Sequence, residues 1–484
     1  MENTERNVRR RPNPRRRMKK KIRRFIRKYK PVARKFAPLA ILSLVLILFI
    51  SFVVGSVQRG DAQREAQRKK NLKAQEAQQQ QLIEWNKEAN DLLAKAEALA
   101  AAYDYDAAIA MLDTFTGDMK DFNALVVTRE RYVQTKETMV PWNNPSEIPN
   151  LSFHILIAEP SRAFANAGYG DGWKRNFITT TEFSRILQQL YDNGYVLVDM
   201  DDVITATETE DGFNYEVNTL YLPEGKKPIM FTQTHVNYYT YMVDGDNDGL
   251  ADKKGNGFAS KLILDENGNL TNTLVTKDGT TLYGDYDFVP ILESFIELHP
   301  DFSYRGARAV LAVSGYDGLF GYRTDPETAK KIGQEYYENE LATLPAVLEA
   351  LREKGYKFGC YTHGSNASGT LAYGNITADK IREDLEKWKK EVTPLLGEVE
   401  YMVFAKDSDI STGTGAYSGE KYEVLKEAGF RYYLGFCDSN SPWFTRTNEY
   451  IRQGRIMVTG NSLAKYPKMF EGLFETIPVL DSSR

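Results

Sequence analysis

The stretch ELATLPAVLEALREKGYKFGCYT, residues 340–362, contains the unit that decides the fold. Its apolar residues first recur at the three- and four-residue spacing of an amphipathic helix, over 340–355. Gly355 stands where a helix C-terminal glycine belongs. The aromatic and apolar run 356–362 that follows is typical of a buried strand. A helix followed directly by a strand is the building block of a parallel α/β sheet.

The same unit recurs on both sides of this stretch. Short apolar runs predict further strands at 151–157, 227–233, 307–315, 399–405 and 430–436. Amphipathic segments predict helices at 288–299, 377–392 and 418–429, the last followed by Gly429, and one that begins near Thr179, which has capping-box spacing to Glu182. The alternation predicts parallel strands wrapped by helices, an α/β barrel-like domain.

In such a barrel the functional residues lie at the C-terminal ends of the strands. We therefore expect the site in the segments that follow the predicted strands, namely 231–239, 314–324, 360–368, 404–410 and 436–444.

The charge of the chain is unevenly distributed. The 484 residues have a net charge of -4, yet residues 1–35 carry 17 Lys and Arg against 2 Glu, while the rest carries 45 basic and 64 acidic side chains. The uncharged run 36–57 is long enough to cross about 30 Å of hydrocarbon as one helix. It is longer than a usual signal-peptide core, and no clear A-x-A cleavage site precedes Gln58.

These features predict a signal-anchor, a single uncleaved transmembrane helix in the cell membrane. The positive-inside rule places residues 1–35 in the cytoplasm and the acidic bulk outside the cell. The alternative is a cleaved signal peptide. Topology alone accounts for the basic block, so we expect no nucleic-acid partner.

Residues 58–138 predict a helical stalk, since 61–136 contains no proline and is rich in Ala, Gln, Glu and Lys. Two Ala- and Leu-rich segments flank the turn 103–106 and resemble one tetratricopeptide-type hairpin. A protein partner docking on 90–136 is the functional alternative to a simple spacer. Two prolines, Pro141 and Pro145, end the helix ahead of an outer domain at 148–484.

The hydrophobic content of 42% supports a sizeable core and excludes global disorder. Cys360 and Cys437 have no metal-type spacing. We expect two buried small side chains, with a disulfide as the alternative.

The outer domain resembles the polysaccharide deacetylase (NodB-homology) family, of the membrane-anchored Gram-positive bacterial type. The matching stretches are LSFHILI (151–157), TTTEFSRILQQLYDNGYVLVDMDD (179–202), KPIMFTQTHVNYY (227–239), HPDFSYRGARAVLAVSGYDGLFGYRT (299–324), GYKFGCYTHGS (355–365) and YIRQGRIMVTGN (450–461). The resemblance implies a distorted (β/α) barrel that hydrolyses N-acetyl or O-acetyl groups of cell-envelope polysaccharide or peptidoglycan. It also implies a divalent metal, usually zinc, that activates water.

The positions that carry this chemistry in the family are substituted here. Aligned on the flanking VNYY, the family's Asp-Asp pair, a base and a metal ligand, falls on Thr234 and His235. Aligned on GYKFG, its two metal-binding histidines fall on Tyr361 and Ser365. A threonine hydroxyl is no general base near neutral pH, and Ser and Tyr are poor zinc ligands. Ala405, in VFAKDSDI, stands where the family has a proline.

These substitutions predict a pseudoenzyme that keeps a carbohydrate groove and lacks the zinc-like metal and deacetylase activity. A rewired, active metal site formed by His235, His363 and one carboxylate, Asp407 or Asp409, is an alternative. A protein-interaction scaffold that uses the helical hairpin is another.

An acidic loop has better metal spacing. Four aspartates, Asp244, Asp246, Asp248 and Asp252, follow D-x-D-x-D-G-x-x-D, in which Gly249 permits a sharp bend. Alternating aspartates of this kind converge on calcium in extracellular loops. We expect a weak bracing calcium site; the alternative is a solvated turn.

Other candidate residues lie near the predicted strand ends. Tyr238, Tyr239, Trp443 and Phe444 are expected to stack on sugar rings or to pack in the core. Arg323 is expected to contact an anionic sugar or to hold its loop. His154, inside the first predicted strand, and His299, at a helix end, are expected to be structural.

Overall fold

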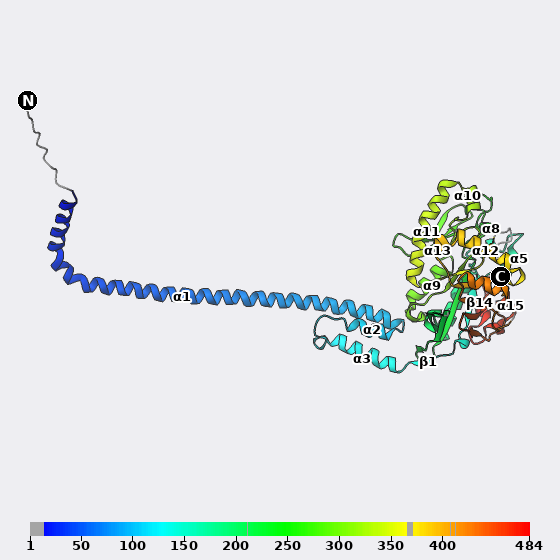
Figure 1. Ribbon diagram of the computed structural model, residues 1–484, viewed down its shortest axis with the longest axis horizontal. Coiled ribbons are helices and arrows are strands. Elements are labelled where there is room, and N and C mark those ends of the chain that lie inside the picture. Colours follow the sequence, from blue (N-terminus) through cyan, green and yellow to red (C-terminus); the bar gives the residue numbers. More distant parts are fainter. Residues whose placement is uncertain (1–13, 211, 365–370, 407, 412) are drawn as a thin grey trace, which may run out of the picture. The chain divides into compact units, whose positions relative to one another are not determined.

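The computed structural model describes residues 14–210, 212–364, 371–406, 408–411 and 413–484. The chain divides into two compact units, Met1–Glu88 and Ala89–Arg484. Helix α1 (Pro14–Ala101) begins in the first unit and ends in the second (Figure 1). Every strand that the structure describes belongs to the second unit.

Seven parallel strands form a closed barrel in the second unit. They are β2 (Asn150–Phe153), β7 (Lys227–Thr234), β11 (Val310–Val313), β12 (Lys357–Cys360), β13 (Tyr401–Val403), β14 (Tyr432–Cys437) and β16 (Ile451–Met457). Each strand pairs with the next one in this order, and β16 pairs with β2 to close the ring. The predicted α/β barrel is therefore confirmed.

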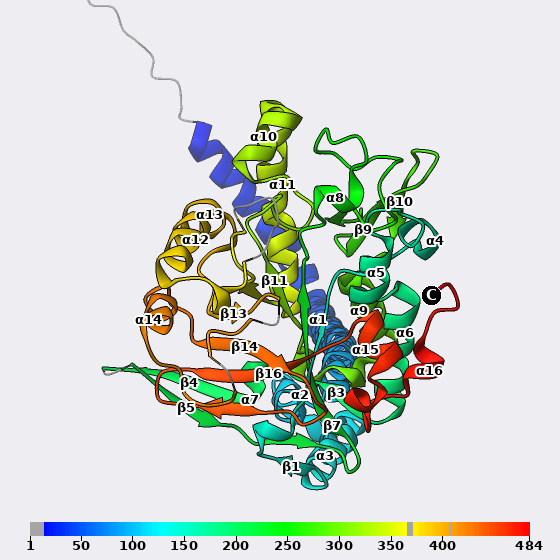
Figure 2. The same ribbon diagram turned by 90° about the vertical axis from the view of Figure 1, so that its right-hand side faces the viewer.

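Helices surround these strands, because the crossovers between parallel strands run over the outside of the barrel (Figure 2). The predicted helices are present as α6 (Thr180–Asp192), α9 (Phe288–Leu298), α11 (Gln334–Lys354), α12 (Ala378–Glu391) and α14 (Glu420–Glu427). The expected capping box of α6 is formed: Glu182 N–H donates to Thr179 Oγ1 at 3.1 Å, and Thr179 N–H donates to a Glu182 carboxylate oxygen at 2.8 Å.

The glycine that ends α11 is required by its backbone. Gly355 has a φ of +102°, and a Cβ at this position would lie 2.8 Å from the carbonyl oxygen of Gly306. Both the left-handed conformation and the close approach exclude a side chain.

The observed elements differ from the prediction in two places that matter for the site. Strand β2 ends at Phe153 rather than at 157, because the chain turns away and Leu156 N–H donates to the buried carboxylate of Asp287 at 2.7 Å. The tail 450–461, not predicted as a strand, contains β16, which completes the barrel.

Smaller sheets decorate the barrel. The antiparallel pair β4 (Ile204–Thr209) and β5 (Gly212–Val217) is one, and β8 (Lys261–Leu264), β9 (Leu270–Val275) and β10 (Thr281–Gly284) form another. Cys360 and Cys437 are both buried free thiols, as expected for small core side chains.

Residues 89–137 form a helical hairpin within the second unit. The end of α1 packs with α2 (Tyr105–Leu112) and α3 (Asn123–Glu137), and Ala96, Ala108 and Leu125 are buried between them. At the turn, Tyr103 has a φ of +64°, and its hydroxyl donates to the carbonyl oxygen of Asp301 at 2.8 Å, which ties the hairpin to the α/β domain.

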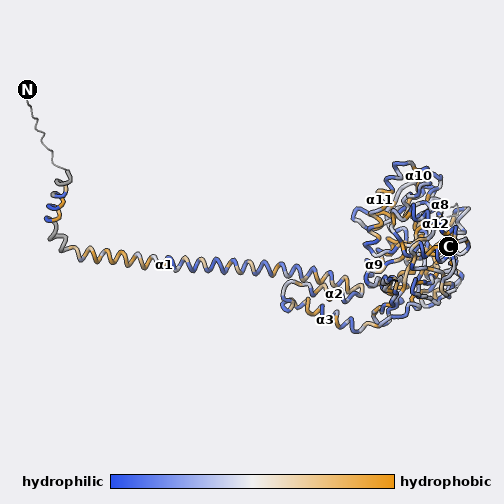
Figure 3. The backbone as a smooth tube through the Cα atoms, in the orientation of Figure 1, coloured by the Kyte–Doolittle hydropathy of each residue, from blue (hydrophilic) through white to orange (hydrophobic). Residues whose placement is uncertain are grey.

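The first unit consists of the long part of α1. Its segment 36–57 is the apolar stretch that Figure 3 shows in orange. The large apolar side chains of this segment are exposed, because no other part of the described chain covers them. By length and composition, this part of α1 is apolar enough to cross a membrane.

Candidate functional site

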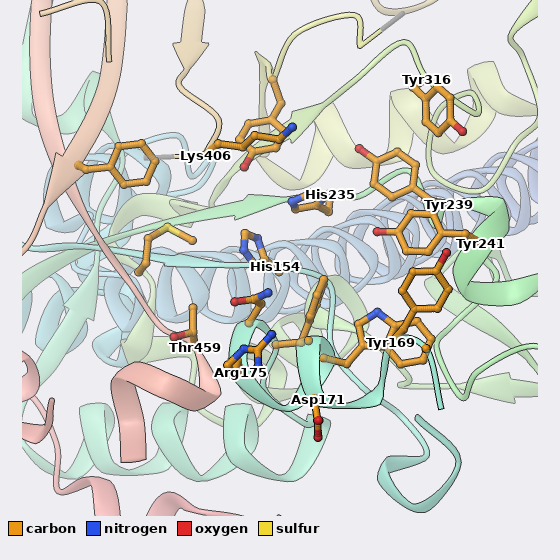
Figure 4. Close-up of a pocket in the computed structure, with 18 residues that line it drawn as sticks. His154, Tyr169, Asp171, Arg175, His235, Tyr239, Tyr241, Tyr316, Lys406 and Thr459 are labelled. Carbon is orange, nitrogen blue, oxygen red and sulfur yellow. The ribbon is translucent and has the colours of Figure 1, made fainter. Parts of the chain in front are cut away.

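A cavity of about 800 Å³ lies at the carboxyl end of the barrel (Figure 4). Each of the seven barrel strands contributes one lining residue at or just after its end, and these are His154, His235, Tyr316, Tyr361, Lys406, Phe436 and Met457. Segment 168–177, which contains α5 (Gly170–Asn176), supplies much of the remaining wall. The cavity therefore occupies the face that carries function in parallel barrels.

Aromatic rings form a continuous series along one wall of the cavity. Trp173 stacks on Tyr169 with ring centroids 5.3 Å apart, Tyr169 is 5.7 Å from Tyr241, Tyr241 stacks on Tyr239 at 5.7 Å, and Tyr239 is 5.8 Å from Tyr316. Tyr169 and Tyr241 are 51% and 38% exposed, so this wall reaches solvent.

Two histidines face each other deeper in the cavity. The ring centroids of His154 and His235 are 4.6 Å apart in an edge-to-face arrangement. His154 Nδ1 lies 2.6 Å from Thr234 Oγ1, whereas His235 Nδ1 is buried and has no hydrogen-bond partner among the described residues. Tyr361 also packs against His235, with ring centroids 5.1 Å apart.

Both imidazoles are held in the neutral form at neutral pH. Burial, together with the neighbouring charge of Lys406, lowers the pKa of His235 to about 4. Burial is also the largest cause that lowers the pKa of His154 well below its usual range, followed by His235 and Arg455. Arg455 is fully buried in the barrel, where it donates to Ser152 Oγ at 2.9 Å and to the Phe404 carbonyl oxygen at 2.7 Å.

The loops that form the cavity hold non-glycine residues in the left-handed region. His235 (φ +63°) follows β7, Thr362 (+75°) follows β12 and Lys406 (+55°) follows β13. Non-glycine residues adopt such angles rarely, and they persist only where surrounding contacts impose them. One such contact is Asn237, which donates to the Ser314 carbonyl oxygen at 2.6 Å and so joins the loops after β7 and β11.

The expectation that His154 is a structural residue inside a strand is wrong in its placement. Because β2 ends at Phe153, His154 lies in the loop that follows and lines the cavity beside His235. His299 does lie at a helix end, as the C-terminal cap residue of α9, with its ring 4.3 Å from that of Tyr191.

The residues at the family's metal and base positions do not fit a hydrolytic metal centre. Thr234 is fully buried and its hydroxyl is engaged with His154. Tyr361 contributes a phenol rather than an imidazole, and Ser365 lies outside the described residues. In the described part of the chain, no third His, Cys, Asp or Glu completes a ligand set with His154 and His235.

The residues of the rewired alternative are not brought together around His235. The ring of His363 faces Glu391, with Nε2 2.9 Å from a carboxylate oxygen, and does not line the cavity. Asp409 accepts from Tyr417 at 2.7 Å and pairs with Arg452 at 3.0 Å. Asp407 lies outside the described residues.

Of the residues predicted to contact sugar, the structure places only Tyr239 at the cavity. Tyr238 is buried and donates to Asp287 at 2.7 Å. Arg323 is buried and donates to backbone carbonyl oxygens of Tyr238 and Asp317 at 2.8 and 3.1 Å, so it holds its loop rather than facing a ligand. Trp443 covers Gly454 and donates to the Phe436 carbonyl oxygen at 3.2 Å.

The lining residues that were not singled out from the sequence include Trp173, Arg175, Tyr241 and Lys406. The signal was present for two of them, since Lys406 directly follows the predicted strand 399–405 and Tyr241 follows the VNYY segment. Trp173 and Arg175 lie in a long crossover whose return to the cavity depends on tertiary structure.

The acidic loop brings three of its four aspartates together. Ligand oxygens of Asp244, Asp246 and Asp252 lie within 4.8 Å of one another. Asp244 and Asp252 also accept backbone N–H groups of the loop, with Asp244 Oδ2 2.7 Å from Gly249 N. Asp248 instead accepts from Leu250 N–H at 2.8 Å. Whether calcium binds here stays a prediction.

The comparisons with known proteins give a distant likeness of fold. The chain is similar to a crystal structure from Bacillus anthracis described as the "putative polysaccharide deacetylase BA0330", with a TM-score of 0.31 and 12% sequence identity. The match covers 65% of each chain, less than two thirds of that protein's length. A likeness this low carries no argument about activity.

No protein-family model matches the chain. No curated protein matches it either. The class that the structure itself defines is an α/β protein with a seven-stranded parallel barrel, an aromatic cavity at its carboxyl end and a long apolar N-terminal helix.

Proposed function

We propose that this protein is a membrane-anchored binder of cell-envelope polysaccharide, and that its deacetylase-like barrel does not perform metal-dependent deacetylation. The observation that carries the proposal is the aromatic series at the carboxyl end of the barrel. Sugar rings stack their apolar faces on aromatic side chains, and partly exposed tyrosines also offer hydroxyl groups to sugar oxygens. A cavity of about 800 Å³ is of a size that takes small ligands or a few sugar units.

The side chains at the centre support the proposed absence of hydrolysis. Deacetylation through a metal-bound water needs a ligand set with an open position and a general base. Thr234 supplies neither function while its hydroxyl is bound to His154. Neutral His154 and His235 could accept a proton, but the described residues supply no carboxylate beside them.

The apolar segment 36–57 supports the membrane part of the proposal. The basic residues ahead of it favour an N-terminus in the cytoplasm, which would place the barrel at the cell envelope where polysaccharide is found.

The test is co-sedimentation of the full chain, in detergent micelles, with purified insoluble peptidoglycan. We expect binding, and we expect Tyr241→Ala to weaken it about fivefold. The matched control is Tyr283→Ala, which removes a tyrosine that is 67% exposed on β10, away from the cavity, and should leave binding unchanged.

The same samples are assayed for acetate release in the presence of zinc or cobalt. We expect no release above background. Release that is lost on His235→Ala would overturn the proposal and favour the rewired metal site. If the chain does not bind peptidoglycan but binds a protein through residues 90–136, the scaffold alternative replaces the proposal of glycan binding.

A further inference from the structure

The charges at the cavity are unbalanced toward the positive. Lys406 and Arg175 line it, and neither forms an ion pair or a side-chain hydrogen bond with a described residue. The one described carboxylate of the lining, Asp171, is exposed at the rim and lies away from the histidine pair in Figure 4. Surface cations usually have no fixed partner, so the lack of one does not by itself indicate a ligand site. The position of Lys406 is the more specific observation.

Lys406 is held at the cavity by its backbone. It lies three residues after the end of β13 and has a left-handed φ of +55°, and His235, directly after β7, has a φ of +63°. Figure 4 shows the Lys406 ammonium group on the same side of the cavity as His235. Exposed Lys406 and half-buried His235 thus lie on different loops of one cavity, and both have a backbone conformation that only surrounding contacts can impose.

Lys406 and the buried Arg455 each act on one of the two histidines. Lys406 helps to lower the pKa of His235, and buried Arg455 helps to lower that of His154. Two positive charges, one on β16 and one in the loop after β13, therefore act on the histidine pair.

The two cations of the lining, Lys406 and Arg175, only donate hydrogen bonds, whereas its hydroxyl, amide and imidazole groups can both donate and accept. Burial raises the pKa of Tyr239 and Tyr241, so these phenols keep their protons and donate as well. A ligand group rich in acceptor atoms and negative in charge complements this set.

We propose that the cavity selects an anionic glycan, and that Lys406 holds the carboxylate or phosphate group of a sugar unit above His235 while neighbouring rings stack on the tyrosine wall. This inference rests on the proposed function and specifies its ligand class. An anionic group so placed forms charge-assisted hydrogen bonds that a neutral sugar cannot form.

The test is isothermal titration of the full chain in detergent micelles with three probes: tetragalacturonate, N-acetylglucosamine 6-phosphate and the uncharged N-acetylglucosamine tetramer. We expect one acidic probe to bind at least about tenfold more tightly than the neutral one, as charged hydrogen bonds predict. That preference should shrink as sodium chloride rises from 50 to 300 mM. The acidic probe that binds identifies the anionic group.

Variants separate the lysine from general effects on folding. Lys406→Gln should reduce the acidic preference to less than threefold and leave neutral binding unchanged, while Lys406→Arg should retain the preference. Lys277→Gln, which removes an exposed lysine in the β9–β10 turn, is the matched control. Thermal melting of each variant verifies that it is folded.

Equal affinity for acidic and neutral probes would overturn the inference and leave the proposed function intact. An acidic preference that survives in Lys406→Gln would also overturn the role of this residue. No binding of any probe would overturn both the inference and the proposed function.

Discussion

At the residue scale, the centre of the site is defined by His235, an imidazole that the fold holds neutral. Its Nδ1 is buried without a partner among the described residues, and burial and Lys406 lower its pKa to about 4. An unsatisfied buried nitrogen costs stability. Because His235 lines a cavity, its Nδ1 is available to a bound ligand, which would supply the missing hydrogen-bond partner.

The lowered pKa makes a prediction about acid stability. In the unfolded chain His235 binds a proton below about pH 6.5, whereas in the folded chain it does so only below about pH 4. The unfolded state therefore gains a proton first, and folded stability falls as pH drops from about 6.5 to 4. Between pH 7 and pH 5, the free energy of unfolding of the wild type should therefore fall by about 1–2 kcal/mol more than that of His235→Gln.

Urea unfolding of both proteins at the two pH values, followed by tryptophan fluorescence, measures this difference. Comparison with the wild type cancels the contributions of other groups, such as Asp287, whose pKa burial raises to about 6. If the two proteins differ in unfolding free energy by the same amount at pH 7 and at pH 5, the account of His235 is contradicted.

Sequence reasoning found some of these residues and missed others for a physical reason. His235, Thr234 and Tyr361 were placed by their distance from apolar flanks, which set the register of a strand end. His154 was misplaced because the strand is cut short by Asp287, more than 130 residues away in the sequence, which captures the Leu156 N–H. No local pattern contains that contact.

At the element scale, the glycine after α11 sets how closely a helix approaches the rest of the barrel. Gly355→Ala should destabilise the fold by about 2–3 kcal/mol, since the left-handed conformation costs about 1–2 kcal/mol and the new Cβ collides with the Gly306 carbonyl oxygen. Gly429→Ala, after α14, is the matched control. It has a φ of +90° but open space around its Cβ, so it should lose only the conformational cost of about 1–2 kcal/mol.

Thermal or urea unfolding of the two variants ranks these costs. Equal losses would show that the close approach at Gly355 does not matter.

The capping box, the helices and these terminal glycines were predictable because their determinants lie within a few residues of each other. Strand β16 was not, since its pairing with β2 joins the two ends of the domain.

The acidic loop makes a prediction about metal binding at the same scale. If Asp244, Asp246 and Asp252 bind calcium, 10 mM calcium should raise the melting temperature of the full chain by about 2–4 °C. Asp246→Asn should remove this shift, and magnesium, which prefers a tighter octahedral site, should reproduce little of it. A melting temperature that does not respond to calcium would leave the loop braced by its own backbone hydrogen bonds.

At the scale of the whole molecule, the chain contains an apolar helix and a barrel with an aromatic cavity at its carboxyl end. The order of strand and helix patterns predicted the barrel, because periodicity records which faces are buried. The contents of the cavity were predicted less well, since they come from seven strand ends and a distant crossover that meet only after folding.

The anchor makes a prediction at this scale. Removal of residues 1–57 should release the protein from membranes into the soluble fraction, whereas the full chain should resist extraction by high salt and yield to detergent. Protease added to intact cells should cleave the barrel but not the basic segment. Protection of the barrel would contradict the proposed orientation.

The most direct test of the central claim is the affinity of the full chain for soluble peptidoglycan fragments, measured by isothermal titration with and without EDTA. Binding with the same dissociation constant in both conditions, and without acetate release, is the predicted result. Binding that requires zinc, or the appearance of acetate, would contradict the claim that this barrel binds glycan without a hydrolytic metal centre.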